Sequence, residues 1–117
     1  MLQHVAHETR AEDVDAVLAF WALLGFEPVE PPPSLAGRTH WVQRGGTQIH
    51  LLLTADPVVP TAGHTAVVAA DYDAALAALR AAGHPVEPRA EHWGVPRAFV
   101  KDPSGHVVEV MSAPPPG

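Results

Sequence analysis

The chain has 117 residues, a length that favours one domain with a real hydrophobic core. Its net charge of -6, without a basic cluster, argues against a nucleic-acid partner. The lack of Cys excludes disulfides, thiolate metal ligands and a cysteine nucleophile. No signal peptide or membrane-spanning apolar run is present, so we expect a cytoplasmic protein that makes no membrane contact.

The first half of the sequence predicts a strand, a helix and three further strands. Apolar residues recur at helical spacing from Ala11 to Leu24, and Gly25 marks the helix end. Glycines at 45–46 predict the turn of a hairpin. The expected elements are a strand over 2–8, a helix over 11–24, a strand over 26–29, a loop over 31–37 and hairpin strands over 39–43 and 47–53.

The second half repeats this order. When the halves are overlaid, Gly25 falls on Gly83 and Trp41 falls on Phe99. This indicates an α+β domain built from a βαβββ unit used twice. The expected elements are a strand over 64–69, a helix over 71–82, a strand over 85–87, a loop over 89–95 and hairpin strands over 97–101 and 106–111. We expect one domain over 1–117, with modules 1–55 and 61–112 and a loose tail at 113–117.

Four polar side chains interrupt apolar strands at matching places in the two halves. They are His4 and His50 in the first half and His64 and Glu109 in the second. A buried carboxylate must be paired, protonated or bound to a metal, because an isolated buried charge is too costly. Strand alternation allows the four to face one another. Two other interpretations stay open: Glu109 faces water on an edge strand, or His50 and Glu109 form a hydrogen-bonded pair without metal.

Several short motifs, in order over residues 2–111, carry a family resemblance. They are Leu2-Gln3-His4-Val5, the segment from Phe20 to Phe26, Ile49-His50-Leu51, Gly63-His64-Thr65, Asp102-Pro103-Ser104-Gly105 and Val108-Glu109-Val110. The chain thereby resembles the vicinal oxygen chelate superfamily of glyoxalase I, bleomycin resistance proteins and extradiol dioxygenases. The resemblance implies a glyoxalase-like fold, in which two tandem modules form a curved mixed-sheet cup with the helices outside.

The resemblance also implies a metal site. By position, the ligands are His4, His50, His64 and Glu109, and the ion is Zn, Ni, Co, Mn or Fe. Glyoxalase I has Glu where this chain has His50. A divalent metal polarises a carbonyl or enolate oxygen of the substrate, and a base then moves a neighbouring proton. Glu109 and Glu8 are the candidate bases.

Further residues are candidates for lining a substrate pocket. Trp41 and Phe99 hold equivalent positions and either wall the pocket or pack in the core. Trp93 lies in a predicted loop, where ligand contacts concentrate, and either lines the cup or forms a dimer contact. Arg38 and Arg97 precede or begin matching strands, and either hold an anionic substrate or face water.

We therefore expect a metal-dependent enzyme of the glyoxalase type, an isomerase, lyase or epimerase, acting on a small oxygenated molecule. Two alternatives remain. One is a metal-free drug-binding protein of the bleomycin-resistance type. The other is a non-haem iron dioxygenase of the extradiol type, for which His4, His64 and Glu109 supply two imidazoles and one carboxylate. We also expect a homodimer, since pairing covers exposed strand edges.

Overall fold

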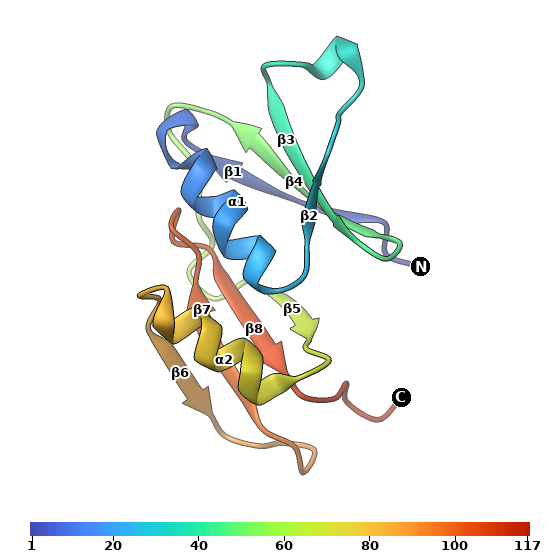
Figure 1. The fold of residues 1–117 in the computed structure, drawn as a ribbon, viewed down its shortest axis with the longest axis vertical. Helices are drawn as coiled ribbons and strands as arrows, with labels where there is room; N and C mark the ends of the chain where they lie inside the picture. Colours follow the sequence, from blue (N-terminus) through green and yellow to red (C-terminus); the bar gives the residue numbers. More distant parts are fainter. The chain divides into compact units, whose positions relative to one another are not determined.

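The computed structural model describes all 117 residues and divides the chain into two compact units, residues 1–59 and 60–117. Each unit contains one four-stranded sheet and one α-helix of ten residues (Figure 1). The order of elements in both units is strand, helix and three strands. This confirms the predicted α+β class and the two tandem βαβββ modules.

The first unit follows the predicted order of elements. They are β1 (His4–Thr9), α1 (Val14–Leu23), β2 (Glu27–Val29), β3 (Thr39–Arg44) and β4 (Thr47–Leu53). The sheet order is β1-β4-β3-β2, and β1 pairs with β4 in parallel while the other pairs are antiparallel. Residues 11–13, predicted as α-helix, form a 3-10 turn that leads into α1.

The second unit repeats this topology. Its elements are β5 (Thr65–Val68), α2 (Tyr72–Ala81), β6 (Val86–Arg89), β7 (Arg97–Lys101) and β8 (Val107–Met111). The sheet order is β5-β8-β7-β6, again with one parallel pair, β5 with β8. Strand β6 continues two residues beyond its predicted end and so includes Arg89.

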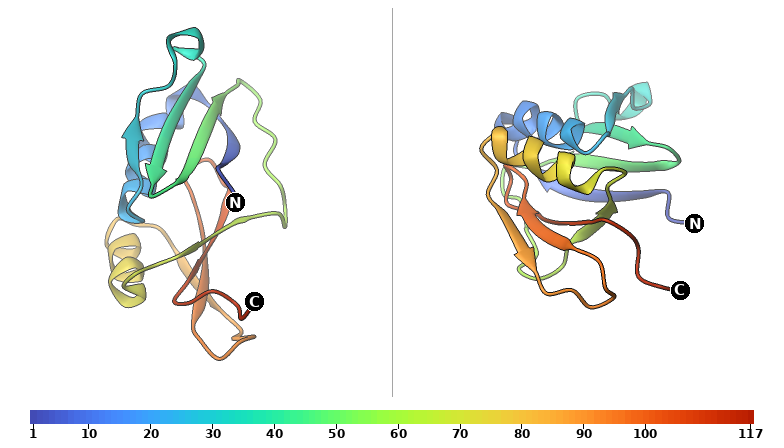
Figure 2. Two further views of the ribbon diagram at one scale, coloured as in Figure 1. Left: turned by 90° about the vertical axis from the view of Figure 1, so that its right-hand side faces the viewer. Right: turned by 60° about the horizontal axis from the view of Figure 1, so that its bottom comes forward.

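Helix α1 covers one face of the first sheet (Figure 2). Val17, Phe20 and Trp21 of the helix are buried, as are Ile49 and Leu51 of the central strand β4. Burying these apolar side chains is the main favourable contribution to the stability of the unit. Since side chains alternate along a strand, the residues between them, including His50, point to the face opposite α1.

The second sheet has the same division between its faces. Leu76 and Leu79 of α2 are buried together with Val67, Val108 and Val110 of the sheet. Alternation therefore directs Glu109, between the two buried valines of β8, to the face opposite α2. At the start of α2, the side chain of Asp71 caps the helix by accepting a hydrogen bond from the backbone N–H of Ala74 at 3.0 Å.

The turn between β7 and β8 is built around Asp102. Its Oδ1 accepts hydrogen bonds from the backbone N–H groups of Ser104 and His106, both at 2.9 Å. Gly105 has φ of +92°, a conformation that favours glycine. Asp102 is buried, and burial raises the pKa of its carboxyl above 3.8, although the hydrogen bond from His106 opposes that shift. The turn thus fixes the register of the hairpin that carries Glu109.

Candidate metal and ligand site

In the first unit, three aromatic rings stack on the sheet face opposite α1. The imidazole of His50 lies between the rings of His4 and Trp41, with both centroid distances 4.0 Å and interplanar angles of 11° and 3°. The backbone explains this, because Ala6, two residues after His4, pairs with His50, and Trp41 pairs with His50 from the other side. The stack buries His50, which is 8% exposed.

Glutamine side chains orient both imidazoles of this stack. His50 Nε2 lies 2.8 Å from Oε1 of Gln48, and His4 Nδ1 lies 2.6 Å from Oε1 of Gln3. An amide oxygen only accepts, so each of these nitrogens carries a proton and donates. Burial lowers the pKa of His50, and the nearby His4 lowers it further, which favours the neutral imidazole. The neutral ring of His50 then keeps a lone pair on Nδ1, the form that ligates metal.

The second unit holds an imidazole and a carboxylate in contact. His64 Nε2 lies 3.1 Å from Oε1 of Glu109, and His64 Nδ1 lies 2.9 Å from the carbonyl oxygen of Ala62. Both ring nitrogens therefore face acceptors, whereas a neutral imidazole has only one N–H to donate. The arrangement therefore needs either a proton or a metal cation between His64 Nε2 and Glu109 Oε1.

Arg97 is the other partner of Glu109. Its Nη1 lies 3.4 Å from Oε2 of the carboxylate, and the two side chains are 12% and 8% exposed. The guanidinium also donates from Nε to the carbonyl oxygen of Ala90 at 2.8 Å. Its Cζ lies 5.9 Å from the ring centroid of Trp93 and 5.5 Å from that of Phe99. Glu109 is thus paired with His64 and Arg97.

The two units position these groups by the same strand register. In the first unit, Ala6 and Trp41 flank His50 on the neighbouring strands. In the second unit, Ala66 and Phe99 flank Glu109 in the same way. The other two predicted ligands, His4 and His64, each stand two residues before the alanine that pairs with the central strand of their unit. The backbone therefore gives the four predicted metal ligands matching places within their units.

The donor groups suit a divalent transition metal. Two atoms that both ligate one ion at about 2.1 Å lie about 3.0–3.4 Å apart, and His64 Nε2 and Glu109 Oε1 lie 3.1 Å apart. Each of the three imidazoles uses one nitrogen to donate to a protein oxygen, as metal-bound histidines commonly do. Within each unit, no cluster of three or more His, Asp or Glu side chains has metal-binding geometry.

The other predicted site residues have different surroundings. Glu8, on β1, accepts a hydrogen bond from the backbone N–H of Val58 at 3.2 Å. Arg38 is exposed just before β3, and the residue that matches Arg97 by register is the buried Thr39, whose hydroxyl donates to the carbonyl oxygen of Leu51. Trp93 donates from Nε1 to the carbonyl oxygen of Ala113 at 3.0 Å while its ring lies near Arg97.

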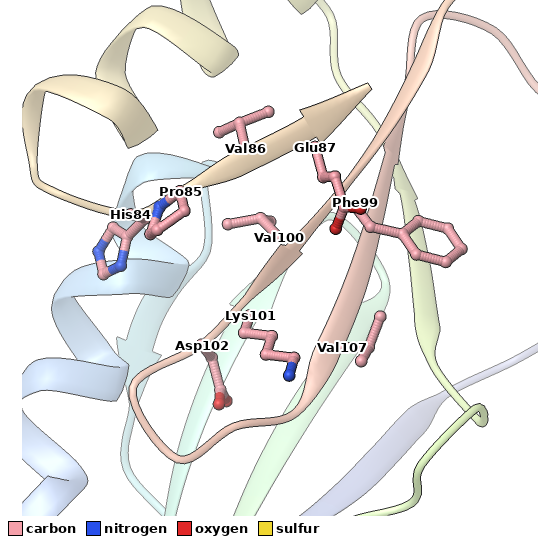
Figure 3. Close-up of a pocket in the computed structure, with 9 residues that line it drawn as sticks. All are labelled: His84, Pro85, Val86, Glu87, Phe99, Val100, Lys101, Asp102 and Val107. Atoms are coloured by element: carbon pink, nitrogen blue, oxygen red, sulfur yellow. The ribbon is translucent and has the colours of Figure 1, made fainter. Parts of the chain in front are cut away.

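A hollow of about 590 Å³ lies on the second unit beside Phe99 (Figure 3). Its lining also includes Glu87, Lys101 and Val107, which were not predicted as site residues. Alternation along β7 could have identified Lys101, because it shares a face with Arg97 and Phe99. Alternation along β4 could likewise have identified Gln48, which orients His50, because Gln48 stands two residues before His50 on the same face of the strand.

No helix is long and apolar enough to cross a membrane.

A family model described as "Glyoxalase/Bleomycin resistance protein/Dioxygenase superfamily" matches residues 2–110. A comparison with curated proteins gives no significant match.

Several solved structures share the fold. A glyoxalase family protein from Bacillus anthracis has a TM-score of 0.84 at 23% identity, over 95% of this chain and 93% of the other. A lactoylglutathione lyase from Agrobacterium tumefaciens has a TM-score of 0.67 at 24% identity, over 95% and 92%. TnmS3, an antibiotic-binding protein from Streptomyces sp. CB03234, has a TM-score of 0.72 at 22% identity, over 95% and 93%.

Proposed function

Since the chain belongs to the glyoxalase/bleomycin resistance protein/dioxygenase superfamily, we propose that it is a metal-dependent enzyme acting on a small oxygenated molecule. The reaction is of the glyoxalase type: isomerisation, epimerisation or lyase chemistry. The observation that carries the proposal is the contact between His64 Nε2 and Glu109 Oε1 at 3.1 Å, a separation at which both atoms can ligate one ion. The matching register of the first unit, with His4 and His50, supports it.

In this proposal His4, His50, His64 and Glu109 ligate one divalent ion, of Zn, Ni, Co, Mn or Fe. When bound, such an ion supplies Lewis-acid stabilisation of negative charge that develops on a substrate oxygen. The lowered pKa of His50 keeps that ring neutral and ready to ligate at neutral pH. Gln48 holds the ring in one tautomer through Nε2.

The same proposal assigns the proton transfer to Glu109. Its two oxygens have different neighbours, since Oε1 faces His64 and Oε2 faces Arg97. We assign proton acceptance to Oε2, which Arg97 contacts at the long distance of 3.4 Å. The other candidate base, Glu8, is already an acceptor for the backbone N–H of Val58, which favours Glu109.

A specific observation also favours a metal-free binding function. Arg97 and a protonated His64 together satisfy the buried carboxylate of Glu109 without any metal. In that case the protein sequesters a small molecule; its structural relative TnmS3 is described as an antibiotic-binding protein.

The dioxygenase alternative also has a structural argument. His50 is stacked between His4 and Trp41 and donates from Nε2 to Gln48, so it can act as a packing group. His4, His64 and Glu109 would then form the two-histidine, one-carboxylate set of non-haem iron oxygenases.

Metal content after purification without a nickel column separates the metal-dependent functions from the metal-free binding function. The wild type is offered Zn, Ni, Co, Mn and Fe in turn and compared with His64→Ala and Glu109→Ala. The control is His40→Ala, which removes an exposed imidazole from β3. We expect one ion per chain in the wild type and the control, and loss of the ion in both site variants. If the wild type binds none of the five, the metal-dependent enzyme is excluded and the binding function replaces it.

A further inference from the structure

Strands β6 and β7 gather positive charge in an acidic chain. They carry three of the seven basic residues, Arg89, Arg97 and Lys101. Arg89 and Arg97 are direct cross-strand partners, an arrangement of like charges that destabilises a sheet. Glu87 contacts Arg89 at 3.3 Å and Glu109 contacts Arg97 at 3.4 Å. The two strands thus carry three cations and one carboxylate, Glu87, and the second carboxylate, Glu109, belongs to the neighbouring strand β8.

The two guanidinium groups converge on Phe99. The Cζ atoms of Arg89 and Arg97 lie 4.8 Å and 5.5 Å from the centroid of its ring. Arg97 is held in place by its hydrogen bond to the carbonyl oxygen of Ala90 and by Trp93. Its contact with Glu109, at 3.4 Å, is longer than the 2.7–2.9 Å of a strong charge-assisted hydrogen bond. Arg97 is therefore fixed in place but not saturated by its carboxylate partner.

The hollow on the second unit begins at the same aromatic ring. Phe99 and Val107 line it from one face of the sheet, and Val86 and Val100, which are cross-strand partners, line it from the other face (Figure 3). Its volume of about 590 Å³ is within the roughly 300–1,000 Å³ typical of small-molecule sites. Asp102 also lines it, but the Oδ1 atom of that carboxyl is bound within the turn. Arg89 and Arg97 do not line the hollow themselves, but both lie over the ring of Phe99, so its apolar surface begins at the ring that the two guanidinium groups contact.

We infer that the ligand of this protein is a small monocarboxylate with an apolar body. The carboxylate binds Arg97, whose planar guanidinium matches carboxylate geometry, and Arg89 adds a second positive charge. The body packs on Phe99 and Val107 in the hollow. A single carboxylate matches the one guanidinium, that of Arg97, which its hydrogen bond to Ala90 holds in place. This inference deepens the proposed function, because it names the substrate class of the site next to Glu109.

The test measures binding of phenylacetate and of its neutral analogue phenylacetamide by calorimetry, using the full chain after metal removal with a chelator. Because no metal is present, the result does not depend on the proposed metal chemistry. We expect phenylacetate to bind at least about tenfold tighter than the amide, since a hydrogen bond to a charged group is worth that factor or more. Arg97→Gln should abolish this preference, and Arg97→Lys should keep part of it.

Arg80→Gln is the matched control, because Arg80 is exposed on α2 in the same unit and the charge change is identical. It should keep the wild-type preference. Equal binding of the two probes, equal losses in Arg97→Gln and Arg80→Gln, or no binding of phenylacetate at millimolar concentration would each overturn the inference. Tighter binding of phenyl phosphate than of phenylacetate would overturn the assignment to carboxylates. If the wild type binds none of the five metals but still binds phenylacetate with this preference, the inference is supported and only the proposed enzyme function is refuted.

Discussion

The two units build the same backbone scaffold and use it for different electrostatics. In the first unit, the central strand presents His50 between two aromatic rings, and its hydrogen-bond partner is the neutral amide of Gln48. In the second unit, the equivalent position holds Glu109, whose partners are an imidazole and a guanidinium. The comparison teaches that strand register fixes where a ligating side chain stands, while its neighbours determine the charge that it presents.

The largest effect should follow from removing the single carboxylate of the proposed ligand set. Glu109→Gln keeps the size of the side chain and an acceptor for Arg97 but removes the negative charge. We expect metal affinity to fall by more than about 100-fold, because loss of a ligand should exceed the roughly 10–100-fold cost of losing an outer partner. Competition with a chromogenic chelator measures the affinity.

Glu27→Gln, an exposed change of the same kind on β2, is the control for this substitution and should retain wild-type affinity. Unchanged metal affinity in Glu109→Gln would show that the second unit does not contribute a carboxylate ligand.

A smaller effect is expected from the amide that orients His50 in the first unit. Gln48→Ala removes the acceptor for His50 Nε2, which lies 2.8 Å away. The ring is then free to change tautomer, and we expect metal affinity to fall about tenfold. Gln43→Ala removes only the next residue in this chain of hydrogen bonds and should have a weaker effect. A metal affinity in Gln48→Ala equal to the wild-type value would remove Gln48 from the site.

The units should also differ in how pH changes stability. Burial raises the pKa of Asp102 above 3.8, so the folded state binds this proton more tightly than the unfolded chain. Its contribution to stability therefore falls as the pH rises from about 3.8 through the folded pKa, and is constant above that. His50 acts in the opposite direction: its pKa is lowered from 6.5, so its contribution is lost as the pH falls below 6.5.

Asp102→Asn tests the first of these directions. Asn keeps an Oδ1 acceptor for Ser104 and His106 but does not titrate. Denaturant unfolding across acidic pH should show the wild type losing stability relative to the variant as the pH rises. Parallel stability curves for the two proteins would contradict the assignment.

The sequence was sufficient for the features that depend on local pattern. Alternation and turn residues predicted the tandem units, and they predicted that His50 and Glu109 point away from the helices. The sequence was insufficient for side-chain contacts that depend on where a strand ends or on how a loop folds. Strand β6 continues to Arg89, and this extension is what sets Arg89 opposite Arg97. The hydrogen bond from Arg97 to Ala90 depends on how the intervening loop folds back, which no periodicity encodes.

The central claim is that both units supply ligands to one metal ion. Native mass spectrometry of two double variants tests it most directly: His4→Ala with His50→Ala, which removes the pair of the first unit, and His64→Ala with Glu109→Ala, which removes that of the second. We predict one ion per chain in the wild type and none in either double variant, with both variants retaining native circular dichroism. A double variant that still binds one ion per chain with wild-type affinity would show that a single unit forms the site, and would contradict the claim.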